Sequence, residues 1–235
     1  PKMKYTEWDL PGFEVIAGQP TTRTDFKVTN CEGIQMACSV FHQEGKLKDQ
    51  RDFVVYCHTR EGNRVQGSFL RHLFLPETNV VCFDFSGSGN SQNDYVTLGI
   101  KEANDIASVT KYIHESFQPR NVALWGRSMG AVSTILFARL PENQKQISCL
   151  VLDSPFTNIE KLAEDVVKSK HYVPSFLIRC GLCCCVRSGL KKRTGVDVGG
   201  IDNCEAVQTI NVPAIYVSGK EDKVAPQKRV YQLFQ

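Results

Sequence analysis

Short apolar runs recur along this chain, and their spacing limits the folds that it can adopt. Each has the length and the β-branched or aromatic content of a strand buried on both faces: Phe53–Cys57, Val80–Phe85, Val122–Trp125, Cys149–Leu152 and Ala214–Val217. Helix-like segments such as Ile100–Ser116 separate them, and Phe26–Thr29 and Ile34–Phe41 have the pattern of an antiparallel pair. Strands that alternate with helices predict an α/β fold with a mostly parallel, doubly wound sheet.

The composition agrees with a folded, enzyme-sized chain. Its 235 residues, 42% hydrophobic and 23% charged, exclude a disordered chain and fit a single domain over residues 1–235. The 28 Lys and Arg residues are scattered among 25 Asp and Glu residues, which predicts no nucleic-acid partner. The longest apolar stretch, Phe176–Val186, is far shorter than the ~20 residues that cross a bilayer. Cys57 and Cys82 lie inside apolar runs, where we expect free, buried thiols and a cytoplasmic protein.

The segment from Ser154 to about Asp202 interrupts the alternation of strands and helices. It contains no strand-like run and ends in the basic, glycine-rich stretch Arg187–Gly200. Ligands bind beyond the carboxyl ends of the strands in sheets of this kind. We therefore expect a helical lid at about residues 155–205 over that edge, with the apolar stretch Phe176–Val186 packed over the mouth of the pocket.

Gly126–Gly130 has the sequence G-R-S-M-G, a G-x-S-x-G motif between a predicted strand, Asn121–Trp125, and a predicted helix. In so tight a turn the serine adopts strained backbone angles, and the glycines let neighbouring backbone pass without a clash against Cβ. The N–H of Met129 then lies at a helix N-terminus, where it can stabilise a developing oxyanion. The motif predicts that Ser128 is a nucleophile.

With these motifs the chain resembles α/β-hydrolases of the serine-aminopeptidase-like branch, which includes monoacylglycerol lipases and acyl-protein thioesterases. The resemblance runs from about Thr24 to Pro226 and rests on Gly126–Gly130, Asp84–Ser91, Leu152–Phe156 and Val217–Pro226. It implies the α/β-hydrolase fold and a serine hydrolase that cleaves an ester, thioester or amide of a small-molecule or acylated substrate. It implies no cofactor and no metal. Asp84–Ser91 we expect to be a structural turn.

By this resemblance the acid of the catalytic triad follows the strand Ala214–Val217, which assigns it to Asp222. A carboxylate there would orient the imidazole of the base and stabilise it when protonated. The order of serine before acid agrees with the chain order in α/β-hydrolases. Two rivals stay open: Glu221, the preceding residue, and Asp153, which ends its own predicted strand.

The base is harder to assign, because no histidine follows Asp222. The histidines at 42, 72 and 114 lie among polar residues, which predicts a surface location, and the one at 171 falls in the predicted lid. His58 ends a predicted strand, where the family carries a structural histidine. The family's catalytic histidine follows a further strand. We therefore expect that strand, its helix and the histidine to be missing from this chain, with the histidine about 15–30 residues beyond Gln235.

Thr59 departs from the family, which usually has glycine after the strand-end histidine. The resemblance assigns the oxyanion hole to the N–H of Met129 together with that of Thr59 or Arg60, and loss of one such donor typically costs roughly 10²–10³ in rate. Thr59 and the unassigned base keep a second hypothesis open: a catalytically inactive hydrolase-fold subunit of a larger assembly. The complete motif opposes it, since strain at Ser128 costs stability without a structural return.

A last cluster consists of Cys180, Cys183, Cys184 and Cys185, followed by basic residues up to Arg193. Three adjacent cysteines without a second paired motif fit tetrahedral zinc poorly. Acylated cysteines beside a basic patch would instead give contact with a membrane surface through Cys180–Arg193. The favoured interpretation is a set of small apolar residues on a lid helix.

Overall fold

The structure is a computed structural model that describes residues 3–170 and 183–235. Within this part of the chain one sheet has the strand order β1-β2-β3-β5-β4-β6-β7-β8. The strands are β1 (Glu14–Ile16), β2 (Gln19–Thr29), β3 (Gln35–Gln43), β4 (Asp52–Cys57), β5 (Asn79–Phe83), β6 (Asn121–Arg127), β7 (Cys149–Asp153) and β8 (Ala214–Val217). The pairs β1–β2, β2–β3 and β3–β5 are antiparallel. The pairs β5–β4, β4–β6, β6–β7 and β7–β8 are parallel. The predicted mostly parallel α/β sheet is confirmed.

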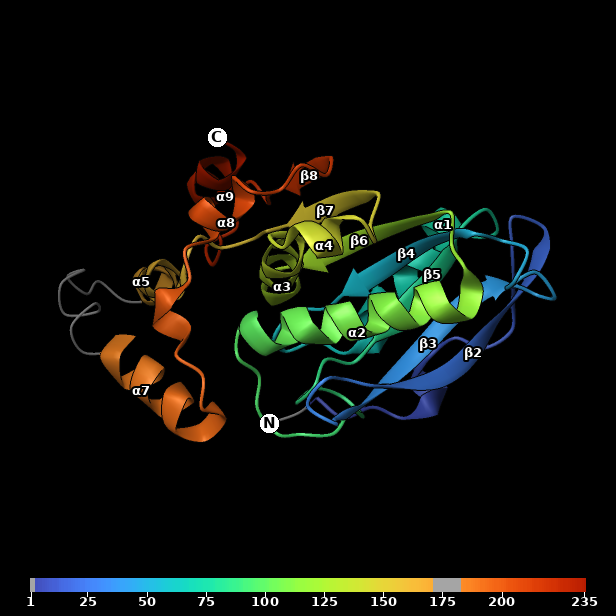
Figure 1. Cartoon of the computed structure of the whole chain (residues 1–235), viewed down its shortest axis with the longest axis horizontal. Coiled ribbons are helices and arrows are strands. Elements are labelled where there is room, and N and C mark those ends of the chain that lie inside the picture. Colours follow the sequence, from blue (N-terminus) through green and yellow to red (C-terminus); the bar gives the residue numbers. More distant parts are fainter. Residues whose placement is uncertain (1–2, 171–182) are drawn as a thin grey trace.

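Helices connect the parallel strands (Figure 1). The longer ones are α2 (Ile100–Phe117), α3 (Met129–Ala138), α5 (Ile159–Lys170), α7 (Cys183–Thr194) and α9 (Gln227–Phe234). The shorter ones are η1 (Glu7–Asp9), η2 (Arg64–Leu70), α1 (Arg71–Phe74), α4 (Pro141–Gln144), η4 (Val198–Gly200) and α8 (Asn203–Val207). The predicted helix at 100–116 is therefore present and ends one residue later.

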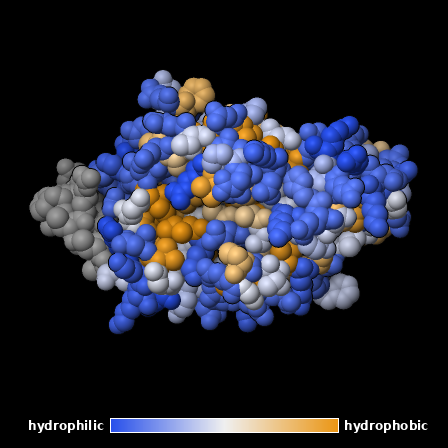
Figure 2. All heavy atoms as spheres, in the orientation of Figure 1, coloured by the Kyte–Doolittle hydropathy of each residue, from blue (hydrophilic) through white to orange (hydrophobic). Residues whose placement is uncertain are grey.

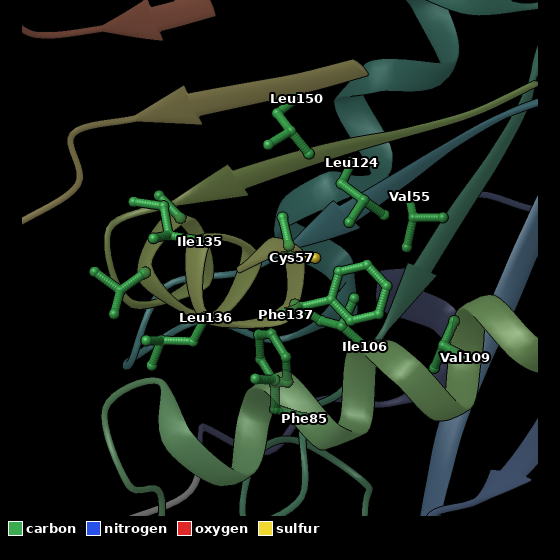
Figure 3. Packing of buried hydrophobic residues seen from close by; sticks show 14 of the residues in the cluster. Val55, Cys57, Phe85, Ile106, Val109, Leu124, Ile135, Leu136, Phe137 and Leu150 are labelled. Carbon is green, nitrogen blue, oxygen red and sulfur yellow. The ribbon is translucent and has the colours of Figure 1, made fainter. Parts of the chain in front are cut away.

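Alternate residues of the central strands divide between two hydrophobic clusters. Val55 and Cys57 of β4 pack with Phe137 of α3 in the larger cluster, between the sheet and the helices α2 and α3 (Figure 3). Val54 and Tyr56 point to the opposite face and join a cluster with residues of η2 and α1. Because both faces are covered, the strands read as continuous apolar runs rather than alternating ones.

The predicted antiparallel pair near the N-terminus is β2 and β3, joined by a turn at Asn30. The Asn30 side-chain oxygen accepts hydrogen bonds from the N–H groups of Glu32 and Ile34, at 3.0 and 2.9 Å. Its amide nitrogen donates to Asp105 of α2 at 2.6 Å. β2 begins at Gln19, seven residues earlier than predicted, because this first half is polar and lacks an apolar run.

The prediction that His42 lies at the surface is wrong. The residue is 5% exposed on β3, with Nε2 2.9 Å from Thr24 Oγ1 and Nδ1 2.9 Å from the Gln43 oxygen. β3 is buried along most of its length between β2 and β5, so a histidine with polar neighbours in sequence is still enclosed by neighbours in space.

The residues between β7 and β8 form an inserted segment, and its described part contains α5, α7, η4 and α8 but no strand. α5 and α7 lie on the side toward which the parallel strands point (Figure 1). Arg229 of α9 donates two hydrogen bonds to Asp165 of α5, at 2.7 and 3.1 Å, and both side chains are largely buried. This pair fastens α5 to the C-terminal helix.

Several expectations fall on residues outside the described ranges. They include His171, Cys180 and most of the apolar stretch Phe176–Val186. Cys183–Cys185 open α7, and their side chains are not described. Within residues 3–170 and 183–235, no helix combines the length and the hydropathy that a membrane span requires.

Candidate active site

Ser128 occupies the turn between β6 and α3, as the motif predicts. Its backbone has φ 52° and ψ −113°, a conformation that L-residues rarely adopt. Its N–H donates to the Asp153 carbonyl at 2.8 Å, and its carbonyl accepts from the Val132 N–H at 3.1 Å. These bonds to β7 and to the first turn of α3 hold the strained turn in place.

The glycines on either side of Ser128 are required by close backbone packing. A Cβ on Gly126 would lie 2.4 Å from the Gly130 carbonyl oxygen, and one on Gly130 would collide with the end of β4. Neither glycine has positive φ, so space rather than backbone conformation selects glycine here.

Ser128 opens onto a cavity of about 340 Å³. Its apolar lining comes from the loop before α2, from α3, from the inserted segment and from the loop after β8: Leu98, Met129, Phe156, Leu162, Val166 and Val224. Figure 2 shows hydrophobic side chains gathered in a hollow where α5 and α7 face the ends of α2 and α3. Its polar side is formed by Thr59, Arg60 and Glu61. The cavity can hold an apolar group directly beside the serine.

The residues expected to form an oxyanion hole line this same cavity. The Met129 N–H belongs to the first turn of α3, where N–H groups lack helical acceptors. The Thr59 N–H donates to Gln66 Oε1 at 3.1 Å, whereas the Arg60 N–H makes no hydrogen bond within the described ranges. The geometry thus leaves the Arg60 amide, rather than that of Thr59, free to bind an oxygen.

Thr59 itself causes no backbone strain, because it is not among the residues with positive φ. The glycine that the family usually has here is therefore not needed for the backbone path of this loop. Gly62 provides the space instead: a Cβ there would lie 2.4 Å from Gln66 Oε1 and 3.1 Å from Thr59 Oγ1. Gln66 was missed in the sequence, since nothing in its spacing marks a side chain that returns to the loop.

His58 is fully buried, and both of its ring nitrogens are occupied. Nε2 accepts a hydrogen bond from the Phe85 N–H at 3.1 Å, so Nδ1 carries the proton and donates it to the Thr59 carbonyl at 2.7 Å. Burial lowers the pKa of the imidazole. His58 therefore joins the ends of β4 and β5 and has no nitrogen left to act as a base on Ser128.

Asp222 is half-buried in the loop between β8 and α9. Its Oδ1 accepts hydrogen bonds from the N–H groups of Val224 and Ala225, at 2.8 and 2.9 Å. Its Oδ2 makes no hydrogen bond within the part of the chain described here. Because Val224 lines the Ser128 cavity, this loop borders the site with one carboxylate oxygen available.

The two rival acids, Asp153 and Glu221, differ from Asp222 in their surroundings. Asp153 Oδ1 accepts from the Ser154 hydroxyl at 3.1 Å, and its Oδ2 lies 3.4 Å from Arg127 Nε, so both oxygens are engaged. Glu221 is exposed and has no hydrogen bond or ion pair within residues 3–170 and 183–235. Asp222 is the one of the three that is both held by backbone hydrogen bonds in the loop beside the cavity and left with an open carboxylate oxygen.

Asp84, in the glycine-rich loop after β5, has the structural role expected of it. The buried carboxylate accepts hydrogen bonds from Tyr5 Oη, from the Arg64 N–H and from the Asn90 N–H, at 2.7, 2.6 and 2.8 Å. Gly89 closes the turn with φ 46°, and a Cβ there would lie 2.4 Å from the carboxylate.

Among the described residues, no group of three or more His, Cys, Asp or Glu could hold a metal ion.

Comparison with known proteins places this arrangement in a family. Residues 48–180, more than half of the chain, match the family described as serine aminopeptidase, S33. The chain belongs to this family. The Pf2001 esterase of Pyrococcus furiosus superposes with a TM-score of 0.72 at 21% identity, covering 100% of this chain and 82% of that one. Acetyl xylan esterase 1 from Thermoanaerobacterium superposes with a TM-score of 0.66 at 15% identity, covering 94% and 76%. The predicted α/β-hydrolase fold is confirmed.

Curated relatives of this family member include lysophosphatidylserine lipases ABHD12. The Danio rerio protein is 29% identical over 140 residues, which cover 57% of this chain and 36% of that protein. The Xenopus tropicalis protein is 29% identical over 201 residues, covering 81% and 48%. The chain therefore spans about a third to a half of the length of these relatives. Together the comparisons identify a hydrolase-fold protein of an esterase- and lipase-like family.

Proposed function

We propose that this chain is a serine hydrolase that cleaves a carboxylic ester with an apolar acyl group, through an acyl-enzyme on Ser128. The observation that carries the proposal is the strained Ser128 turn opening onto an apolar cavity beside the Arg60 and Met129 amides. Ester rather than thioester or amide is favoured because the similar proteins are described as lipases and esterases.

In the proposed reaction Ser128 Oγ attacks the acyl carbonyl carbon, and the base takes the hydroxyl proton. The Met129 and Arg60 N–H groups bind the oxyanion that forms. The bond to the alcohol then breaks, and the alcohol leaves with the proton from the base. Water hydrolyses the acyl-enzyme by the same steps and restores Ser128.

The proposal needs a base that faces the open Oδ2 of Asp222. His58 is engaged on both nitrogens, and His42, His72 and His114 do not line the Ser128 cavity. His171 lies outside the described residues. Because the resemblance implies a catalytic histidine after a further strand, we propose that the base is such a histidine, following Gln235 in the gene product. Its Nε2 would lie within ~3 Å of Ser128 Oγ, with Nδ1 toward Asp222.

The test is labelling of the complete gene product with a fluorophosphonate probe, which reacts with activated serines. Ser128→Ala should abolish labelling while circular dichroism shows an intact fold. The matched control is Ser154→Ala, since Ser154 also follows a strand and has positive φ, 53°, and this variant should label normally. Labelling that persists in Ser128→Ala would move the chemistry to another residue.

Failure of the folded, complete wild-type protein to label would favour the second hypothesis, an inactive subunit of a larger assembly. Contact with a membrane surface through Cys180–Arg193 also stays a proposal. Of the basic residues there, Arg187 and Lys191 pair with Asp197 and are thus partly neutralised.

A further inference from the structure

A second cavity, of about 460 Å³, adjoins the Ser128 cavity and is different in character. The two share Arg60 and Glu61, which form the wall between them. Beyond that wall the lining adds charged and polar side chains to apolar ones: Ser88, Asp94, Tyr95 and Arg193 lie there with Met3 and Val96. The apolar cavity of Ser128 thus adjoins a cavity that carries further charged side chains, an arrangement that suits a substrate with an apolar tail and a charged head.

Arg193 is the cation of the second cavity that lacks an acidic partner. Its guanidinium carbon lies 5.8 Å from the centroid of the Tyr95 ring, which holds the side chain at the cavity by a cation–π contact. No ion pair or hydrogen bond to Arg193 is found in the described ranges, although Arg187 and Lys191 of the same helix both pair with Asp197. Its planar fork of N–H donors is therefore free to bind an anion.

The other charges of the cavity do not supply a second free cation. Arg60 pairs with the neighbouring Glu61, so these two charges largely cancel. Asp94 adds a carboxylate, which would oppose an anion in the same space. Arg193 and Asp94 should therefore affect binding of an anion with opposite signs.

We propose that this second cavity binds the phosphate group of the leaving alcohol in a monoacyl lipid, and that Arg193 selects it. The proposal rests on the proposed function, because it takes the ester to be at Ser128. The acyl chain would lie against Phe156, Leu162 and Val166, and the head would pass the Arg60–Glu61 wall toward Arg193. A guanidinium binds phosphate oxygens through two parallel, charge-assisted hydrogen bonds. A substrate whose leaving alcohol is neutral cannot form this pair of bonds.

The test compares two esters that share an oleoyl chain and differ in one phosphate: oleoyl lysophosphatidic acid and mono-oleoylglycerol. The quantity measured, on the complete gene product, is kcat/KM for oleoyl lysophosphatidic acid divided by kcat/KM for mono-oleoylglycerol. R193Q should lower the ratio about tenfold, with little change for mono-oleoylglycerol, and D94N should raise it about threefold. The control is K192Q, because Lys192 is an exposed neighbour that does not line the cavity, and its ratio should stay unchanged.

Equal effects of R193Q on both esters, or equal effects of R193Q and K192Q, would overturn the proposal. If neither ester is cleaved, the proposed function fails. Calorimetric titration of the Ser128→Ala protein with lysophosphatidic acid then tests the phosphate site at Arg193 independently of catalysis. The phosphate site is supported if R193Q weakens the binding of lysophosphatidic acid and if inorganic phosphate binds more weakly than the lipid. Equal affinity for inorganic phosphate would show a free-phosphate site and overturn the assignment to a lipid head.

Discussion

A Cβ built on Gly130 would lie 1.9 Å from the carbonyl oxygen of Cys57. The same atom would lie 2.8 Å from the His58 carbonyl oxygen, so the first turn of α3 packs directly on the end of β4. Because the obstructing atoms are backbone, no side-chain rotation can relieve the contact. The turn that presents Ser128 and the loop that presents Arg60 are fixed against each other at this point.

Gly130→Ala should lower the free energy of unfolding by about 3 kcal/mol or more, because strand and helix must separate. Urea unfolding measures the loss. Gly189→Ala is the control: Gly189 lies in α7 with nothing within 4 Å of its added Cβ, and this variant should gain up to about 1 kcal/mol. Equal stability of the two variants would contradict the packing argument.

Ser128→Gly should be more stable than Ser128→Ala by about 1–2 kcal/mol, since glycine adopts φ 52° without steric cost and alanine keeps the strain. Both variants lack the hydroxyl, so their difference isolates the backbone term. Chemical denaturation of the pair checks it. The same glycine-over-alanine order is expected at Gln118, the C-cap of α2, where φ is 48°. A reversed order at Ser128 would mean that the turn is not strained.

Gln66→Ala should lower kcat about tenfold with a smaller change in KM, because the loop that carries the Arg60 amide loses the acceptor for the Thr59 N–H. Gln66→Glu keeps an oxygen acceptor at the same place and should restore most of kcat. Steady-state kinetics on a soluble ester measure both variants. If Gln66→Glu is as impaired as Gln66→Ala, this hydrogen bond does not position the loop.

Asp105 should make the fold less stable as pH rises from 4 to 7. Burial raises the pKa of this carboxyl to about 6, although hydrogen bonds from Asn30 and Ser86 lower it. Between the unfolded and folded pKa values the folded protein binds more protons, so this group lowers the stability by about 2 kcal/mol as pH rises from 4 to 7. The wild-type advantage over Asp105→Asn should shrink by that amount between pH 4 and pH 7 in urea titrations. An advantage independent of pH would contradict the shift.

The sequence predicted the central sheet well because burial on both faces leaves a strong signal. The strand predicted at Ala214–Val217 has the same first and last residues as β8, and the helix expected over 100–116 is α2. β1 and the first half of β2 were not predicted, since β1 has only three residues and the first half of β2 is polar. The error at His42 has the same origin, because burial there comes from neighbouring strands rather than from neighbours in sequence.

The candidate site divides in a similar way. Ser128, Met129, Thr59 and Arg60 line one cavity, and motif reasoning could find them because the chemistry requires a fixed local geometry. The choice between the Thr59 and Arg60 amides could not be made from sequence, since it depends on one hydrogen bond from a side chain seven residues later. Arg193 lies still further away, on a helix that meets Tyr95 only in the folded chain.

The Asp165–Arg229 pair has a consequence for how the cavity opens to solvent. α5 supplies Leu162 and Val166 to the apolar lining of the cavity. The Asp165 carboxylate of the same helix is bound by Arg229 of α9, which follows the Asp222 loop. A state with α5 swung away would lose both hydrogen bonds of this pair and would expose the apolar residues that α5 contributes to the cavity, so it would be a minor state. Substrate exchange that needed this state would be correspondingly slow. Its rate would then depend on Asp165 and Arg229, two residues that do not line the cavity.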